Sequence, residues 1–451
     1  MTRKPVPTKP PVERAFLVGV EFRNEKSPIS LEDSLAELAQ LATTVDLEVV
    51  GETSQKIESP NPSTLIGSGK VEEIALLAEE TLANVIIFDT ELSPRHQRDL
   101  EEIFGLRVRV IDRTALILDI FAQHAHTSEG MLQVALAQYE YRLPRLTRAW
   151  THLARQAGGG GGAAGSVGGV GLRGPGETQL EVDRREIRRK ITTLKKELEK
   201  VRAHRQRYRA QRKRSRIPLI SIVGYTNAGK STLLNQITRS DVLVADQLFA
   251  TLDPTTRRVE LPGGHQGLMT DTVGFIQKLP TQLIAAFQAT LEEITEADLL
   301  IHVVDITHPN AIEQAASVDE TLKQINAQHI PVITALNKID RLPQPELAGE
   351  ILAEFQRSVG ISALKGVGIP ELLRMIESEL YENYSPVNVQ IPYTEGQLIS
   401  LFHEQGHILR IEHTRKGVKI QGSIPGRLLA RFSPFQNSFL DDAEESTLED
   451  V

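Results

Sequence analysis

Two hydrophobic patterns alternate in the N-terminal part of the chain. Short apolar runs typical of buried strands occupy residues 15–20, 47–50, 84–89 and 106–111. Between them, apolar residues at helical spacing predict amphipathic helices over 31–41, 70–82, 94–104 and 114–122. Strands that alternate with helices indicate right-handed βαβ units and a mostly parallel sheet. We therefore expect an N-terminal α/β domain with a long helix over residues 15–155, preceded by a Pro-rich flexible arm over 1–14.

The pattern changes after this α/β region. A helical pattern runs from residue 128 to about 155, with an interruption near Pro144, and a glycine-rich loop follows over 156–180. Such glycine density disfavours a packed element, because each residue loses much backbone entropy on ordering. The end of the loop also contains a proline and charged residues. The sequence leaves two interpretations open, a plain linker or a loop that becomes ordered on a partner.

Residues 181–216 form a basic helical arm. Apolar residues at helical spacing make one narrow stripe, so the first part is expected to pack like a coiled coil: Ile187, Ile191, Leu194, Leu198 and Val201. From Arg184 to Arg216 there are sixteen Lys and Arg against three Glu, and the basic run continues after the stripe ends. Like charges at helical spacing repel each other, so we expect an anionic partner, with nucleic acid phosphate as the first candidate.

A glycine-rich loop lies between a buried apolar run at 218–223 and a helical segment at 232–238. The loop matches the phosphate-loop pattern GxxxxGK[ST] in its strand–loop–helix context, with the residues Gly224, Tyr225, Thr226, Asn227, Ala228, Gly229, Lys230 and Ser231. Backbone N–H groups at such a helix N-terminus can surround a polyphosphate. Lys230 is expected to reach the β- and γ-phosphates, and the Ser231 hydroxyl to bind Mg²⁺. The context disfavours the alternative of a turn that binds nothing.

Two further segments fit the phosphate side of the same site. The first follows a predicted strand and contains Asp271, Thr272, Val273 and Gly274. Asp271 is expected to hold Mg²⁺ through water, and the Gly274 amide to sense the γ-phosphate. The second is a polar loop with Phe249, Ala250, Thr251, Leu252 and Asp253. One hydroxyl of this loop should close over Mg²⁺, but Thr251, Thr255 and Thr256 compete, and spacing alone does not choose between them.

A third pair of segments predicts guanine recognition. An apolar run at 331–336 precedes Asn337, Lys338, Ile339 and Asp340. The Asp340 carboxylate can accept hydrogen bonds from N1–H and the exocyclic amine of guanine, which adenine does not offer in that geometry. Asn337 would bond O6 or N7 and fix the loop, the Lys338 stem would cover the base, and a backbone amide for O6 would come from Ser362, Ala363 and Leu364. All signals together, in this order and at strand ends, predict GTP binding.

Phe275 follows Gly274, where many switch GTPases have a Gln that orients water. A phenyl ring neither donates nor accepts a proton. We therefore expect slow intrinsic hydrolysis, with the water positioned by a partner or another loop. A structural interpretation, in which Phe275 fills a hydrophobic notch, is compatible with this.

Around these motifs the sequence predicts a GTPase domain over 217–384, a small C-terminal α+β domain over 385–440 and an acidic tail over 441–451. The small domain should have strands at 387–391, 407–412 and 417–420 and a helix at 395–405. The fold class is thus α/β, a P-loop GTPase domain preceded by an α/β domain and a helical arm, with an α+β domain after it.

Composition narrows the compartment and the chemistry. The 451 residues suffice for about three domains, and 40% hydrophobic and 24% charged residues are ordinary for soluble globular proteins. There is no cysteine, which excludes disulfides, thiolate nucleophiles and cysteine zinc sites and fits the reducing cytoplasm. No apolar run is long enough to span a membrane, and the N-terminus lacks a secretory signal, although a short transit peptide is less firmly excluded. The net charge of −8 argues weakly against nucleic acid, except at the basic arm.

The GTPase motifs, together with residues 66–74, 118–123 and 173–181, resemble the HflX-type GTPases of the Obg–HflX group, which associate with the ribosome. The resemblance covers roughly residues 15–380. It implies GTP/GDP and Mg²⁺ as cofactors, binding to the large (50S) ribosomal subunit and its RNA, and a role in ribosome splitting, rescue or biogenesis. It also implies that Thr251 is the Mg²⁺ ligand, and that Asn227 helps to hold a K⁺ ion in place of a catalytic arginine.

One departure from the family pattern concerns His124 and His126, where arginines are usual. If those arginines contact RNA, binding here is expected to be weaker or pH-sensitive, because histidine titrates near neutrality. We expect a cytoplasmic monomer whose hydrolysis is stimulated by ribosomes. The alternative is a GTP-controlled protein–protein adaptor in which the basic helix pairs with an acidic partner or with the acidic tail.

Overall fold

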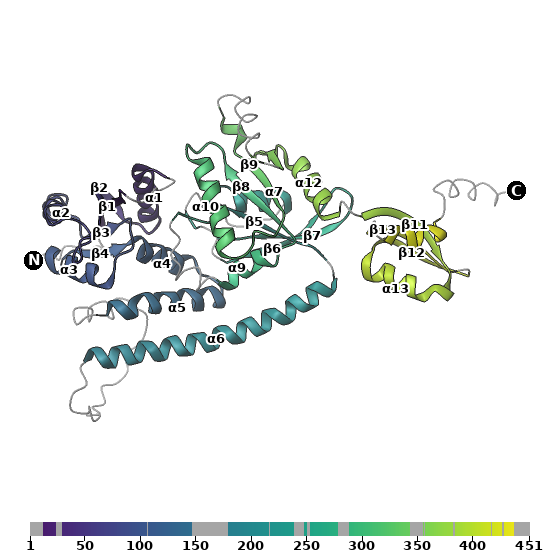
Figure 1. The fold of residues 1–451 in the computed structure, drawn as a ribbon, viewed down its shortest axis with the longest axis horizontal. Coiled ribbons are helices and arrows are strands. Elements are labelled where there is room, and N and C mark those ends of the chain that lie inside the picture. The colour runs from purple at the N-terminus through teal and green to yellow at the C-terminus, as the bar shows by residue number, and fades with distance from the viewer. Residues whose placement is uncertain are drawn as a thin grey trace, which may run out of the picture. The chain divides into compact units, whose positions relative to one another are not determined.

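The structure is a computed structural model in which the described residues fall into two compact units, one up to Leu373 and one from Arg374 onward. Figure 1 shows the fold with its elements labelled. The described residues are 12–23, 29–105, 107–146, 179–215, 217–238, 248–249, 253–277, 288–342, 355, 357–381, 384–415, 417–425 and 428–436.

The first unit begins with a four-stranded parallel sheet in the order β2-β1-β3-β4, as the alternating pattern predicts. Its strands are β1 (Arg14–Phe22), β2 (Glu48–Ile57), β3 (Val85–Phe88) and β4 (Arg109–Asp112). The helices that alternate with them are α1 (Leu31–Thr44), α2 (Ser68–Glu80), α3 (Pro94–Phe104) and α4 (Arg113–His124). Strand β2 is much longer than the predicted 47–50, because an edge strand tolerates the exposed polar residues that obscured its pattern.

Both faces of this sheet are covered. Leu17 of β1 packs in one apolar cluster with residues of α1 and α4, whereas its neighbours Phe16 and Val18 pack in another with residues of α2 and α3. The period of two along a strand explains this division. A parallel sheet buried on both faces also explains why β3 is a continuous apolar run.

Helices α5 (Ser128–Arg145) and α6 (Gln179–Ser215) lie side by side (Figure 1). Of the predicted apolar stripe on α6, Leu198 is buried and the other members are partly buried. Lys195 adds an ion pair with Glu140 of α5 at 2.8 Å. Helix α5 is therefore the neighbour of the first part of the arm, and the coiled-coil-like packing of the stripe stays a prediction. Pro144 lies in the last turn of α5. The predicted helix beyond residue 146, the glycine-rich loop up to residue 178 and the side chains of the basic run after Val201 lie outside the described residues.

A six-stranded sheet follows in the order β10-β9-β8-β5-β7-β6, parallel except for the pair β6–β7. Its strands are β5 (Leu219–Gly224), β6 (Thr255–Glu260), β7 (Gln266–Asp271), β8 (Leu299–Asp305), β9 (Val332–Asn337) and β10 (Ser358–Gly360). Its helices are α7 (Lys230–Thr238), α9 (Gln288–Thr295), α10 (Ala311–Gln324) and α12 (Ile369–Tyr381), the last of which continues into the second unit. The predicted nucleotide motifs follow the carboxyl ends of β5, β7 and β9, where open α/β sheets bind ligands.

The two sheets of the first unit share one apolar core. The cluster that includes α1 and α4 also contains Tyr225, Phe249 and Phe275 of the nucleotide-binding part. The rings of Phe121 and Phe249 meet edge to face, with centroids 4.7 Å apart. The N-terminal α/β part therefore packs directly on the loops that surround the phosphate loop.

The second unit is an antiparallel three-stranded sheet in the order β11-β13-β12, as predicted for a small α+β domain. Its elements are β11 (Tyr384–Ile391), α13 (Gly396–Gln405), β12 (His407–Thr414), β13 (Gly417–Pro425) and α14 (Leu429–Phe432). Phe402 and Phe432 from the helices pack on Val389 and Ile420 of the sheet. The predicted acidic tail lies outside the described residues. Among the described helices, none is long and apolar enough to cross a membrane.

Candidate functional site

The phosphate loop connects β5, whose six residues are all buried, to helix α7, which begins at Lys230. The Lys230 Nζ donates hydrogen bonds to the carbonyl oxygens of Gly224 at 3.2 Å and Tyr225 at 2.7 Å. Burial lowers the pKa of Lys230 to about 8, and the negative charge of Asp271 opposes this shift. The loop thus has a buried cation at its centre, where a polyphosphate would bind.

The predicted magnesium ligands Ser231 and Asp271 are in contact. The Ser231 hydroxyl donates to Asp271 Oδ2 at 2.6 Å, and Asp271 is fully buried at the end of β7. Hard oxygen donors of this kind suit Mg²⁺, which usually takes its remaining ligands from substrate phosphates and water. No group of three or more His, Cys, Asp or Glu side chains that could hold a metal occurs among the described residues. Ala250, Thr251 and Leu252 lie outside the residues that the structure describes.

The segment after β7 is bonded to the phosphate loop. The Phe275 N–H donates to the Gly224 carbonyl at 3.0 Å, and the Thr226 N–H donates to the Phe275 carbonyl at 2.8 Å. A Cβ at Gly274 would lie 2.9 Å from the Thr226 Cα and 3.0 Å from the Lys230 Nζ, so only glycine fits there. The ring of Phe275 is buried in the shared core, as the structural interpretation of this residue requires.

Asn337 connects the phosphate loop to residues 362–364, the second segment predicted to bind the base. Its Nδ2 donates to the Ala228 carbonyl at 2.8 Å, and its Oδ1 accepts from the Ala363 N–H at 2.9 Å. A hydrogen bond with Ser362 lowers the pKa of Asp340, whereas burial of the carboxyl opposes that shift. Asp340 is therefore an ionised acceptor near neutral pH, as base recognition requires.

Asp305 is a residue of the site that the sequence motifs did not identify. Its Oδ2 lies 2.6 Å from the Lys338 Nζ, which also donates to the Asn227 carbonyl at 3.0 Å. Asp305 ends the buried strand β8, so the same signal that identified Asp271, an acid at a strand end, was available for it.

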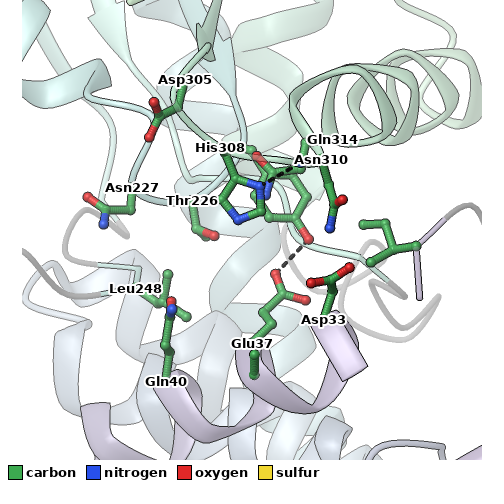
Figure 2. Close-up of a pocket in the computed structure, with 13 residues that line it drawn as sticks. Asp33, Glu37, Gln40, Thr226, Asn227, Leu248, Asp305, His308, Asn310 and Gln314 are labelled. Atoms are coloured by element: carbon green, nitrogen blue, oxygen red, sulfur yellow. Dashed lines mark hydrogen bonds between the residues drawn. The ribbon is translucent and has the colours of Figure 1, made fainter. Parts of the chain in front are cut away.

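A cavity of about 160 Å³ lies between helix α1 and the phosphate loop (Figure 2). From α1 it is lined by Asp33, Glu37 and Gln40, and from the nucleotide-binding part by Tyr225, Thr226, Asn227, Leu248, Asp305, His308, Asn310 and Gln314, among others. A dashed line in Figure 2 marks the hydrogen bond in which the Tyr225 hydroxyl donates to Glu37 Oε1 at 2.6 Å. An acidic helix of the N-terminal part thus borders the predicted nucleotide site.

Two predicted site residues have their described contacts in the N-terminal part. The ring of Phe249 is 2% exposed and packs on Phe121. The Asp253 carboxylate accepts hydrogen bonds from residues that precede helix α5. The structure brings together the other described members of the set: residues 224–231, 271–274, 337–340 and 362–364.

Comparisons with known proteins agree with these motifs. Residues 32–122 match the family described as GTP-binding GTPase N-terminal, 124–212 match the GTP-binding GTPase middle region, and 219–338 match the 50S ribosome-binding GTPase. The GTPase HflX of Caldanaerobacter subterraneus is 42% identical over 424 residues, which are 94% of each chain. The GTPase HflX of Escherichia coli is 43% identical over 394 residues, 87% of this chain and 88% of that one.

The chain belongs to the HflX family of GTPases. The resemblance noted from the motifs is thereby confirmed, as is the prediction of a GTP-binding GTPase with a P-loop α/β fold. Among solved structures, a GTP-binding protein from Sulfolobus solfataricus in complex with GDP is 25% identical, covering 82% of this chain and 99% of that one, with a TM-score of 0.41.

Proposed function

We propose that this HflX-family protein is a slow GTPase whose turnover rises on the large ribosomal subunit, where helix α6 contacts ribosomal RNA. The observation that supports it best is the pair of hydrogen bonds from Asn337, which connects the phosphate loop to the segment at 362–364. A base and a polyphosphate could therefore be held by one rigid arrangement. Other parts of the proposal follow from individual side chains.

Base selection is proposed to depend on Asp340, with Lys338 covering the base. An ionised carboxylate accepts two N–H groups from guanine and offers nothing to the acceptor N1 of adenine. The pKa of Asp340 is lowered by Ser362, so this acceptor is charged over the physiological range. The ion pair of Lys338 with Asp305 fixes the Lys338 stem beside the phosphate loop.

Phosphate binding is proposed to depend on Lys230, the backbone N–H groups of residues 229–231 and the Gly274 amide. Ser231 and Asp271 would hold Mg²⁺, Asp271 through water, with Thr251 as a further ligand. When bound, Mg²⁺ would neutralise the negative charge that develops on the phosphate oxygens. A K⁺ ion beside Asn227 is proposed from the family resemblance, and the side chain of Asn227 borders the cavity of Figure 2.

Slow intrinsic hydrolysis is proposed because Phe275 replaces the usual Gln and its ring is buried in the core. A buried phenyl group cannot hold the attacking water, so another loop or the ribosome has to order it. Stimulation by ribosomes would then be the main control of turnover, in the cytoplasm where ribosomes are found.

Ribosome binding is proposed from the family description of residues 219–338 and from the charge of helix α6. Helix α6 packs against α5, where Lys190 lies over the Tyr139 ring and Lys195 pairs with Glu140. Other basic side chains of its first part are exposed, among them Arg188, Arg189 and Lys196. Phosphates of RNA would neutralise them, and the affinity should fall steeply with salt.

The test is co-sedimentation of the full chain with purified 50S subunits, with GTP, a non-hydrolysable analogue and GDP in parallel. We expect binding in the GTP and analogue arms, release with GDP, and a faster turnover in the presence of the subunits. The idea fails if the subunits neither bind the GTP form nor raise turnover. A weak salt dependence would instead support a protein–protein adaptor, because such contacts release few counterions.

A further inference from the structure

A continuous series of buried and partly buried polar contacts joins the first sheet to the phosphate loop. It runs from Asp89 at the end of β3, through Arg113 of α4 and Glu37 of α1, to Tyr225 of the phosphate loop and the backbone of Gln277. Buried polar groups are costly unless they are paired, so such a series specifies one arrangement of its members.

Arg113 holds the N-terminal end of this series. Its guanidinium is 2% exposed, its Nη1 donates to Asp89 Oδ1 at 2.8 Å, and its Nη2 donates to Glu37 Oε2. The Ser34 hydroxyl donates to the other Asp89 oxygen at 2.8 Å. Burial works against the charge of Arg113, but the carboxylates of Glu37 and Asp89 outweigh it, and the pKa of Arg113 is raised. Arg113 thus fixes Glu37 so that its second oxygen faces the phosphate loop.

Tyr225 holds the other end. Its hydroxyl donates to Glu37 Oε1 at 2.6 Å and accepts from the Gln277 N–H at 2.9 Å. Burial and the charge of Glu37 raise the pKa of Tyr225, so the hydroxyl keeps its proton at physiological pH. With its single proton given to Glu37, the phenol oxygen can only accept from Gln277. The Gln277 N–H can only donate and the Glu37 carboxylate can only accept, so the two partners together fix the directions of both hydrogen bonds.

The Gln277 N–H that bonds to Tyr225 belongs to the segment after β7, which begins with Thr272 and contains Gly274, the residue expected to sense the γ-phosphate. Phe275 is bonded through its N–H and its carbonyl to Gly224 and Thr226, the two neighbours of Tyr225. Gly274 precedes it and lies against Thr226 and Lys230. Residues 275–277 are thus hydrogen-bonded to the backbone of Gly224 and Thr226 and, through the Gln277 N–H, to the hydroxyl of Tyr225.

We propose that Tyr225 is a positioning residue for GTP hydrolysis, and that Glu37 of the N-terminal domain acts through it to hold residues 274–277 in the arrangement that hydrolysis needs. The inference rests on the proposed GTPase function, and it gives the N-terminal α/β domain a direct part in that reaction. A chain whose N-terminal domain moved away would lose the acceptor that orients the Tyr225 hydroxyl.

The test compares Tyr225→Phe, Glu37→Ala and the double variant in the full chain. The control is Tyr141→Phe, because Tyr141 is also buried and its hydroxyl donates to a buried carboxylate, Asp112 Oδ1, at 2.8 Å, but within the N-terminal domain alone. Single-turnover GTP hydrolysis gives the rate, and nucleotide titration gives the affinity. Hydrogen exchange at the Gln277 amide reports the contact itself and requires no hydrolysis.

We expect each of the two single variants to lower the hydrolysis rate by about five- to tenfold, the effect of one lost buried hydrogen bond, with GTP affinity changed by less than about twofold. The double variant should be no slower than Tyr225→Phe, since Glu37 acts through the same hydroxyl. The backbone amide hydrogen of Gln277 should exchange faster in both single variants. Tyr141→Phe should match the unmodified chain in every measurement.

An unchanged rate and an unchanged Gln277 amide in Tyr225→Phe would overturn the inference. Additive losses in the double variant would overturn the link through Glu37. An unmodified chain that binds GTP without hydrolysing it, while Tyr225→Phe still frees the Gln277 amide, would count against the proposed function and support the contact. The two failures can therefore be told apart.

Discussion

The carboxylate of Asp253 accepts hydrogen bonds from both the hydroxyl and the backbone N–H of Thr127, the latter at 2.8 Å. It also accepts from the His126 N–H at 2.9 Å, while the Thr127 hydroxyl caps helix α5 by accepting from the Gly130 N–H at 3.0 Å. A negative charge at a helix N-terminus is favourable. Asp253 belongs to the loop that is expected to close over Mg²⁺, two residues after Thr251. This part of the loop is therefore bonded to the N-terminus of helix α5 in the N-terminal part.

This contact predicts an effect on stability that can be measured without nucleotide. Asp253→Ala should lower the free energy of unfolding by about 1–3 kcal/mol, because it leaves three donors without their charged acceptor. Thr127→Ala should cost about 1 kcal/mol through loss of the helix cap, whereas Thr127→Ser, which keeps the hydroxyl, should cost much less. Urea unfolding monitored by circular dichroism measures these changes, and equal midpoints for all variants would contradict the role of the carboxylate.

The lowered pKa of Lys230 predicts that GTP binding takes up protons, and that the uptake increases with pH. Its pKa of about 8 means that, in the free protein, the amine is mostly charged at pH 7 and mostly neutral at pH 9. Phosphate oxygens favour the charged form, so binding should raise the pKa and take up a proton at pH 9. Calorimetry in buffers with different ionisation enthalpies measures the uptake. We expect uptake close to one proton at pH 9 and little from this group at pH 7, and no increase with pH would contradict the assignment.

Asp340→Asn should convert the nucleotide preference from guanine to xanthine. The amide can donate to the carbonyl that replaces the exocyclic amine, but it cannot accept from both N–H groups of guanine. The affinity for GTP should fall by about a hundredfold or more, since hydrogen bonds to a charged group are lost. Titration with GTP and XTP measures the preference. The control is Lys365→Ala, because the Lys365 Nζ lies 3.9 Å from Asp340 and its loss should change GTP affinity little.

Packing of the arm predicts a contrast between two neighbouring residues of α6. Leu198 is 8% exposed in the apolar stripe, so Leu198→Ala should destabilise the chain by about 2–3 kcal/mol. Lys195→Ala removes only a half-exposed ion pair with Glu140 and should cost less than about 1 kcal/mol. Thermal unfolding of both variants compares their stabilities. A larger loss of stability in Lys195→Ala than in Leu198→Ala would contradict the role of the apolar stripe in packing the arm.

Local features of the sequence predict the strands and the nucleotide motifs. The runs that became β3 and β5 are continuous and apolar because parallel strands are buried on both faces, and the motifs follow strand ends, where the fold concentrates polar groups. The alternating strands and helices likewise predict that the strands of the first sheet run mostly parallel.

Contacts between distant residues could not be predicted in this way. Tyr225 and Glu37 are 188 residues apart, and Asp253 and Thr127 are 126 apart, so no periodicity connects them. Arg113, at the start of a helix, looks like a solvated charge in sequence, although two carboxylates from other elements hold it in the core. Phe249 belongs to the loop motif expected on the phosphate side of the site, and no local pattern indicates that its ring has an aromatic partner in the N-terminal domain.

The edge-to-face contact of Phe121 and Phe249 has a consequence for dissecting the protein. Expressed from residue 217 onward, the chain would lack Phe121 and helix α1, and the rings of Tyr225 and Phe249 would face water. Uncovered aromatic surface of this kind promotes self-association. The GTPase segment alone should therefore be less soluble than the whole chain, and a polar replacement at Phe249 should restore its solubility.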